Sequence, residues 1–227
     1  MPDIKTQDVQ ISANGESLSA FVARPEGGGP FPGLIVIQEW WGLEGHIKDV
    51  TQRFAAEGFV ALAPDLYHGQ VATEPSEAQK MMMSLDMPRA GKELVKAVDY
   101  LTADSAVSNV GAIGYCMGGG LALTLACNSA KVKAVAPYYG ANPNPIEKVK
   151  DIQGPVFAVY AENDHFINEQ VREALKGALQ QHGKKFEINV YPGTGHAFFN
   201  DTRPDIYNAE AAKDVWGKTL SFFRANL

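Results

Sequence analysis

One cysteine lies in a short motif that is typical of catalytic nucleophiles. Residues 114–120 read GYCMGGG, which places Cys116 between Gly114 and Gly118 at a Gly-x-Cys-x-Gly spacing. The spacing predicts a sharp turn from a strand into a helix, where glycines remove the side chains that would collide and the central side chain points into a site. Free N–H groups at the start of such a helix would stabilise a thiolate and later an oxyanion. By itself the motif fits a small buried cysteine as well as it fits a catalytic nucleophile. A third interpretation is that Cys116 supplies a redox or metal-binding sulfur.

An acidic residue and a histidine follow two later strands of the predicted sheet. Asp164 lies in AENDHF after the seventh predicted strand, and His196 lies in GTGHAFF after the eighth. The order nucleophile, acid, histidine is that of the α/β hydrolases. We therefore predict that Asp164 accepts the N–H of His196, and that His196 takes the thiol proton and later delivers one to the leaving group. Alternatively, Asp164 would cap the next helix and His196 would bond a backbone carbonyl, but three such coincidences at strand ends are improbable together.

The remaining four histidines show no pattern of a metal site. No H-x-H or H-E-x-x-H spacing occurs, so we expect no metal ligands among them. His165 is adjacent to the acid and is the natural rival of His196, but it precedes the last strand, so we predict a structural role for it. His46, His68 and His182 are predicted to be surface or loop residues.

The residues that follow the third predicted strand are candidates for an oxyanion hole. The segment reads VIQEWWGLEGH. In α/β hydrolases a loop at this position supplies one oxyanion N–H, and the residue after the nucleophile supplies the other, so we assign the hole to the backbones of Trp40 and Met117. Glu39 is unusual, because a carboxylate at the end of a buried strand is costly without a partner. Its apolar neighbours favour a functional burial beside the thiol over an ordinary exposed glutamate.

These motifs require a framework of alternating strands and helices, and the hydrophobic pattern predicts one. Apolar runs predict eight strands, at residues 8–13, 18–23, 33–38, 59–65, 110–115, 132–138, 155–161 and 186–192. Intervening segments predict six helices, at residues 47–58, 74–86, 87–104, 118–127, 168–183 and 208–226. The Asn14–Gly15 pair predicts a hairpin, so the sheet should open with an antiparallel pair and continue mostly parallel. Met81 to Met83 are expected to pack under a cap helix rather than to line a flexible pocket.

Composition and charge narrow the class of protein. The chain has 227 residues, of which 45% are hydrophobic, and no low-complexity linker, so we predict a single α/β domain over residues 1–227. A net charge of −6 and scattered lysines argue against nucleic acid or an anionic membrane as the main partner. The N-terminus does not resemble a signal peptide and the apolar runs are too short to span a bilayer, so we expect a cytoplasmic monomer or small homo-oligomer. Cys116 and Cys127 form no C-x-x-C pair, and Cys127 is predicted to lie in the core.

The chemical motifs, taken together, resemble those of the dienelactone hydrolase family, also called carboxymethylenebutenolidases. The segments that carry this likeness are QEWWG, GYCMGG, ENDHF and GTGHAF, with FVALAPDLYHG after the fourth predicted strand, and it covers nearly the whole chain. It implies the α/β-hydrolase fold, in agreement with the predicted eight-stranded, mostly parallel sheet with helices on both faces. It also implies a triad of Cys116, His196 and Asp164, and a Glu39 side chain that hydrogen-bonds the resting thiol. The implied reaction is hydrolysis of a small enol-lactone or ester through a thioester, without metal or organic cofactor.

One departure from the family pattern concerns the substrate. Members that open dienelactone hold its carboxylate with two arginines, one after the fourth strand and one four residues past the catalytic histidine. Residues 67–86 contain no arginine, and the second position, which we expect to face the mouth of the pocket, is Asn200. We therefore predict a preference for neutral small-molecule lactones or esters. Asn200, Arg203 and Tyr67 are the candidate substrate-binding residues, and Arg203 is the one that would replace a missing arginine.

Three other functions are compatible with parts of the pattern. A thioesterase or a general carboxylesterase would use the same triad. A non-catalytic ligand-binding relative would keep the pocket, but it has no need to retain all three triad residues. A redox sensor built on Cys116 lacks a plausible resolving cysteine.

Overall fold

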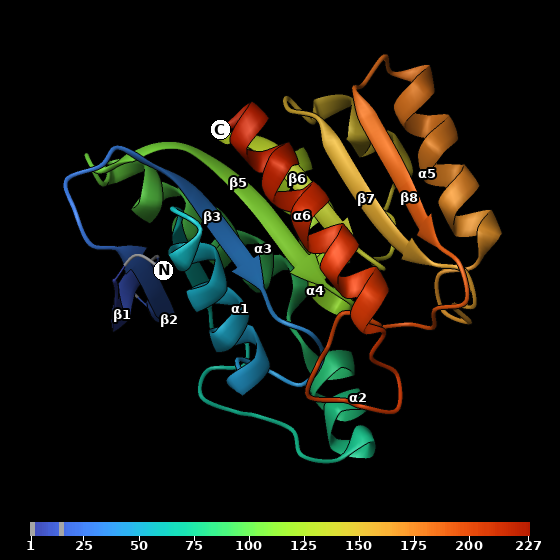
Figure 1. The fold of residues 1–227 in the computed structure, drawn as a ribbon, viewed down its shortest axis with the longest axis horizontal. Coiled ribbons are helices and arrows are strands. Elements are labelled where there is room, and N and C mark those ends of the chain that lie inside the picture. Colours follow the sequence, from blue (N-terminus) through green and yellow to red (C-terminus); the bar gives the residue numbers. More distant parts are fainter. Residues whose placement is uncertain (1–2, 14–15) are drawn as a thin grey trace.

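The computed structural model describes residues 3–13 and 16–227, and its centre is an eight-stranded sheet (Figure 1). The strands are β1 (Ile4–Ala13), β2 (Glu16–Pro25), β3 (Phe31–Ile37), β4 (Val60–Pro64), β5 (Val107–Tyr115), β6 (Val132–Tyr138), β7 (Val156–Ala161) and β8 (Phe186–Tyr191). Their order across the sheet is β1-β2-β4-β3-β5-β6-β7-β8. The eight predicted strands are confirmed, although β1 begins at Ile4 rather than at residue 8.

The sheet is antiparallel at one edge and parallel elsewhere. β1 pairs with β2, and β2 with β4, in antiparallel register, whereas the other neighbouring strands pair in parallel. The antiparallel opening is thus confirmed, while the Asn14–Gly15 turn lies outside the described residues. β4 and β7 are buried along their whole length, as expected for central strands with both faces covered.

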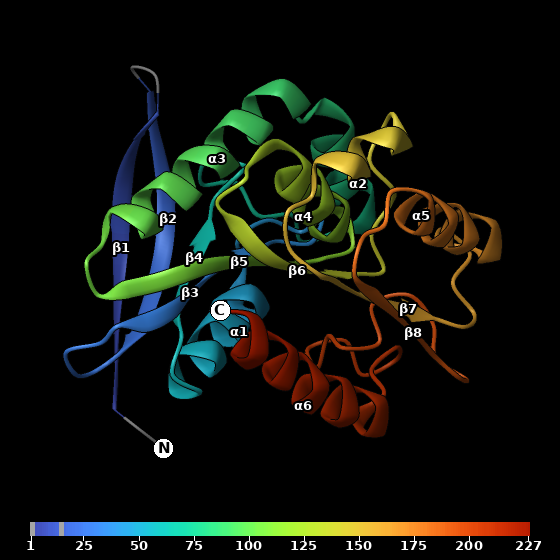
Figure 2. The ribbon, with the colours of Figure 1, turned by 90° about the horizontal axis from the view of Figure 1, so that it is seen from above.

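Helices cover both faces of the sheet, as predicted. They are α1 (Gly45–Ala56), α2 (Pro75–Ser84), α3 (Met87–Ala103), α4 (Met117–Asn128), α5 (Glu169–Gln181) and α6 (Ala209–Asn226), with a short 3-10 helix, η1 (Ile146–Asp151), that the sequence pattern did not predict. Figure 2 shows α3, α4 and α5 on one face and α1 and α6 on the other. No helix in the described part of the chain is long and apolar enough to cross a membrane.

Each face of the sheet has its own hydrophobic core. On one face, Leu94 of α3, Leu121 of α4 and Leu175 of α5 pack with the strands. Cys127 is buried in this cluster, as predicted. On the other face, Ile47 of α1 and Phe223 of α6 belong to the second cluster.

The parallel strands bring the predicted site residues to one edge. β3, β5, β7 and β8 run in the same direction, so their carboxyl ends lie at the same edge of the sheet. Glu39, Cys116, Asp164 and His196 follow these four strands in turn. α2 lies beyond the carboxyl end of β5 (Figure 1), where it can cover the site.

Candidate active site

Cys116 occupies the tight turn that its motif predicts. It is the N-cap of α4, with φ 55° and ψ −117°, a positive φ that is rare for a residue with a side chain. A Cβ at Gly114 would collide with the carbonyl of Gly118, and one at Gly118 would collide with the carbonyl of Ile37. The Cys116 N–H donates to the carbonyl of Tyr138 on the neighbouring strand, at 3.1 Å. The strained turn is therefore closed by glycines and anchored to the sheet.

Asp164 and His196 form the predicted pair. Nδ1 of His196 lies 2.7 Å from Oδ2 of Asp164. Oδ1 of Asp164 accepts the backbone N–H groups of Phe166 and Ile167, at 2.8 and 2.9 Å. Burial raises the pKa of Asp164, but the hydrogen bond from His196 and the two backbone bonds outweigh it and hold the pKa below its ordinary value. The carboxyl is thus both ionised and fixed in position.

The imidazole of His196 lies between the acid and the thiol. Burial lowers its pKa, but hydrogen bonds with Asp164 and with Cys116 outweigh burial and raise the pKa to about 10. The rings of Tyr139 and Phe166 flank the imidazole, with centroids at 5.1 and 5.3 Å. The fold therefore brings the three predicted triad residues together and orients the ring between two aromatic neighbours.

Glu39 is buried, as expected, but its contact differs from the one that the family resemblance implies. Its Oε2 accepts a hydrogen bond of 2.7 Å from Nδ2 of Asn200, and Oε1 has no partner within the described residues. Burial raises the pKa of Glu39 to about 7, although the Asn200 bond lowers it. The expected hydrogen bond to the Cys116 thiol is absent from the described contacts, and the contact observed at this carboxylate is the one from the Asn200 amide.

Asn200 does not take the position that the sequence indicated. It was expected at the mouth of the pocket, but it is only 1% exposed. Its Nδ2 donates to Glu39, and its Oδ1 accepts from the backbone N–H and the hydroxyl of Thr202. Asn200 lines the cavity and holds Glu39.

The two backbone groups assigned to the oxyanion hole both border the same cavity as the thiol. Trp40 and Met117 line it together with Cys116. The carbonyl of Cys116 accepts the N–H groups of Gly119 and Gly120. Among the described residues, neither Trp40 nor Met117 uses its N–H in a hydrogen bond, so both donors are available.

A cavity of about 600 Å³ encloses these groups. Its walls are mostly apolar and aromatic, and they include Trp40, Trp41, Tyr139, Phe166 and Ile206. A volume of this size with few polar groups is typical of a small-molecule site. Phe166, which sequence reasoning missed, is 74% exposed beside His196; the signal was an aromatic residue in the polar loop directly after the acid.

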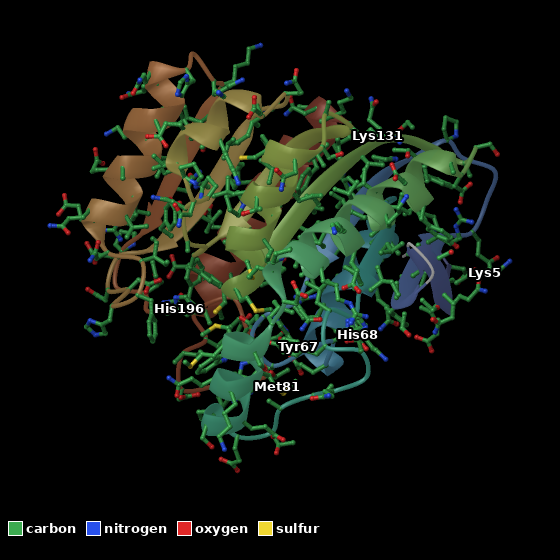
Figure 3. The ribbon with its side chains drawn as sticks, turned by 180° about the vertical axis from the view of Figure 1, so that it is seen from behind. Lys5, Tyr67, His68, Met81, Lys131 and His196 are labelled. Atoms are coloured by element: carbon green, nitrogen blue, oxygen red, sulfur yellow. The ribbon has the colours of Figure 1, made fainter. Side chains whose placement is uncertain are left out.

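The two other candidate substrate-binding residues differ in position. Arg203 lines the cavity, and its guanidinium carbon lies 3.7 Å from the centroid of the Trp41 ring. Tyr67 does not line this cavity: its hydroxyl donates to the sulfur of Met117, at 3.4 Å, and it borders a smaller cavity of about 190 Å³. His196, Tyr67 and Met81 lie toward the same end of the molecule (Figure 3).

The prediction for His46 is wrong. Its side chain is completely buried in α1, and its Nδ1 lies 3.2 Å from Oδ1 of Asp201 on the loop that follows His196. The ring faces inward because it packs near Tyr115 and Phe199. Elsewhere, His165 is exposed at the rim of the cavity. No cluster of three or more metal-binding side chains occurs in the part of the chain that the structure describes.

Known proteins resemble this chain over nearly its whole length. The sequence profile described as "Dienelactone hydrolase family" matches residues 18–227. "Protein usf" of Aquifex pyrophilus is 37% identical, covering 97% of this chain and 99% of that protein. "Putative carboxymethylenebutenolidase" of Saccharolobus solfataricus is 33% identical, covering 96% and 98%. The crystal structure of "Putative Dienelactone Hydrolase" from Klebsiella pneumoniae is 28% identical, covers 98% of this chain and 99% of its own, and superposes with a TM-score of 0.89.

Proposed function

Because the chain belongs to the dienelactone hydrolase family and is a lactone or ester hydrolase, we propose that Cys116, His196 and Asp164 are its catalytic triad. The observation that carries the proposal is the 2.7 Å contact between His196 and Asp164 beside the thiol turn. An acid that orients a histidine, next to a nucleophile on a strained turn, is the arrangement that acyl transfer requires.

In the first half-reaction, the Cys116 sulfur attacks the carbonyl carbon of the ester. The thiol proton passes to Nε2 of His196, the nitrogen that Asp164 leaves free. The N–H groups of Trp40 and Met117 bind the oxyanion. The C–O bond to the alcohol then breaks, the alcohol takes the proton from His196, and the acyl group remains on sulfur as a thioester. The contacts with Asp164 and Cys116 that raise the pKa of His196 stabilise the protonated ring that forms when it takes the thiol proton.

The second half-reaction regenerates the thiol. A water molecule attacks the thioester carbon and gives a proton to His196. The C–S bond breaks, the carboxylic acid leaves, and the sulfur takes the proton back. For a lactone, the released alcohol and acid are parts of one molecule.

Glu39 has an electrostatic role in this proposal. An ionised carboxylate opposes a second negative charge close to it. Glu39 and Cys116 line the same cavity, so Glu39 suppresses the reactivity of the resting thiol. Glu39→Gln should therefore react faster with iodoacetamide near neutral pH, and an equal or slower rate would exclude this role.

The reacting end of the substrate is neutral in our proposal. Glu39 lines the cavity with an oxygen that has no partner in the described part of the chain, and the donor of Asn200 is already bound to that carboxylate. Arg203 is held on the ring of Trp41, and its charge lowers the pKa of Glu39. Comparison of kcat/KM for a dienelactone acid and its methyl ester tests this. We expect the methyl ester to be favoured in the wild type and in Arg203→Ala, whereas an acid preference that Arg203→Ala abolishes would contradict it.

Turnover of 4-nitrophenyl acetate by cysteine variants tests the proposed function. Cys116→Ala should lose hydrolysis while keeping the wild-type circular dichroism spectrum, because alanine fits the turn and lacks the nucleophile. Cys127→Ala is the matched control, since Cys127 lies on the same helix but in the core. Its activity should stay close to that of the wild type. Retained activity in Cys116→Ala would contradict the proposal.

A further inference from the structure

The catalytic cavity borders a second, larger groove that the proposed reaction does not use. This groove has a volume of about 910 Å³. Met82, Met117 and Ala141 line both the groove and the catalytic cavity. The space around the thiol therefore adjoins the groove at three shared residues.

The groove follows one face of α4. Its floor consists of residues spaced three to four positions apart on that helix: Met117, Leu121, Thr124 and Asn128. At a rise of about 1.5 Å per residue, this face extends roughly 16 Å from the turn that carries Cys116. The length suits an extended chain rather than a compact ring.

The other walls of the groove are apolar and adaptable. α3 contributes Met87, Gly91 and Leu94, and α2 contributes Met82. Met82 and Met87 are 37% and 51% exposed, which is high for large apolar side chains. Methionine adapts its shape to ligands, and exposed apolar surface that adjoins a catalytic cavity marks a binding surface. Met81 packs against the cluster that contains Trp41, as expected for the cap helix. The predicted packing is wrong for the other two methionines of the run, because Met82 lines the cavity and Met83 is 77% exposed.

The charge of the groove is opposite to that of the protein. Lys92, Lys96 and Lys148 line it, and its described lining contains no acidic residue, although the whole chain carries a net charge of −6. Lys96 lies 3.8 Å from Asp99, whereas Lys92 and Lys148 form no ion pair with any described residue. Such a surface favours an anionic group on the ligand.

We propose that the groove binds the chain of an elongated ester, with an anionic group at the end remote from the reacting carbonyl. This inference rests on the proposed function, because the reacting end lies at Cys116. The apolar chain would lie along α4 and the anion would meet Lys92 or Lys148. The groove thus assigns to this hydrolase a substrate class larger than a simple lactone.

A tryptophan at Gly91 tests the groove without touching the catalytic residues. A Cβ at Gly91 meets no atom within 4 Å, so a large side chain can enter the groove from α3. Gly177→Trp on α5 is the matched control, because Gly177 is equally unobstructed and lies outside the groove. The substrates are the 4-nitrophenyl esters of acetic acid, dodecanoic acid, dodecanedioic acid and the phosphono analogue of the last.

The expected result is a loss that depends on chain length. In the wild type, kcat/KM should rise from acetate to dodecanoate, because each buried CH₂ is worth about 0.8 kcal/mol, and rise again with a terminal anion. Gly91→Trp should lower the values for the long esters by about tenfold or more and leave acetate within about twofold. Lys92→Gln with Lys148→Gln should remove the gain from the terminal anion, about two- to fivefold for each lysine. The faster of the two anionic esters shows whether carboxylate or phosphonate is preferred.

Different failures have different meanings. If Gly91→Trp lowers the rate for acetate and dodecanoate equally, or if Gly177→Trp has the same effect, the groove proposal is wrong while the proposed function stands. If the wild type hydrolyses none of the esters, the proposed function is wrong. Calorimetric binding of free dodecanedioate, which needs no turnover, then tests the groove proposal by itself. Binding to the wild type that Gly91→Trp abolishes supports the proposal. Absence of binding to the wild type, or equal binding to both proteins, overturns it.

Discussion

The buried carboxyl of Glu39 makes the stability of this protein depend on pH. Burial raises its pKa from 4.5 to about 7, so the folded protein holds this proton more tightly than the unfolded chain does. The contribution to stability is fully present below about pH 4.5 and is lost as the pH rises through about 7. Replacement by glutamine keeps the size of the side chain and removes the ionisation.

The pKa difference sets the size of the effect. Each tenfold change in an ionisation equilibrium corresponds to about 1.4 kcal/mol. The rise from 4.5 to about 7 therefore corresponds to about 3 kcal/mol, most of it lost between pH 5 and pH 8. Glu39→Gln should gain about 2–3 kcal/mol relative to the wild type when the pH is raised over this range.

Urea unfolding of both proteins at pH 5 and pH 8 measures this quantity. Other titrating groups are shared by the two proteins, so most of their effects cancel in the difference between the free energies of unfolding. Glu187→Gln, which changes an exposed glutamate on β8, is the control. If the difference between Glu39→Gln and the wild type is the same at both pH values, the argument that burial dominates the ionisation of Glu39 is refuted.

Three further variants test the site. Asp164→Asn should lower kcat roughly 10²- to 10⁴-fold with unchanged circular dichroism, because the histidine loses the acceptor that orients it; a loss below about tenfold would speak against the triad. Gly118→Ala should lower the free energy of unfolding by about 1–3 kcal/mol, because its Cβ collides with backbone carbonyls, and an unchanged urea midpoint would show that the turn is not tight. Asn200→Leu should cost about 1–3 kcal/mol and raise the pKa of Glu39 above 7, because it removes the hydrogen bond to the carboxylate; an unchanged pH midpoint of stability would exclude that bond.

The elements that position the site could be predicted because their signals are local. Runs of Val, Ile and Ala mark the central strands, and the glycines around Cys116 mark the turn. Asp164 and His196 could be placed because parallel strands end at a common edge, so chain order translates into proximity. η1 was missed because a six-residue 3-10 turn shows no periodic pattern.

Contacts between distant segments could not be predicted. The bond between Asn200 and Glu39 joins residues 161 positions apart, and it depends on how the loop after His196 folds back toward Glu39. A sequence shows that Asn200 follows the histidine by four residues, but not which way its amide points. The burial of His46 has the same origin, because its partner Asp201 comes from that loop.

The central claim is that hydrolysis passes through a thioester on Cys116, and the acyl group itself can be detected. The wild type is mixed with 4-nitrophenyl acetate, quenched with acid during the first turnovers, and digested for peptide mass spectrometry. Our account predicts one acetyl group on the peptide that contains Cys116, present also in Cys127→Ala and absent in Cys116→Ala. Rapid hydrolysis with no acetyl group on that peptide, and with undiminished rate in Cys116→Ala, would contradict it.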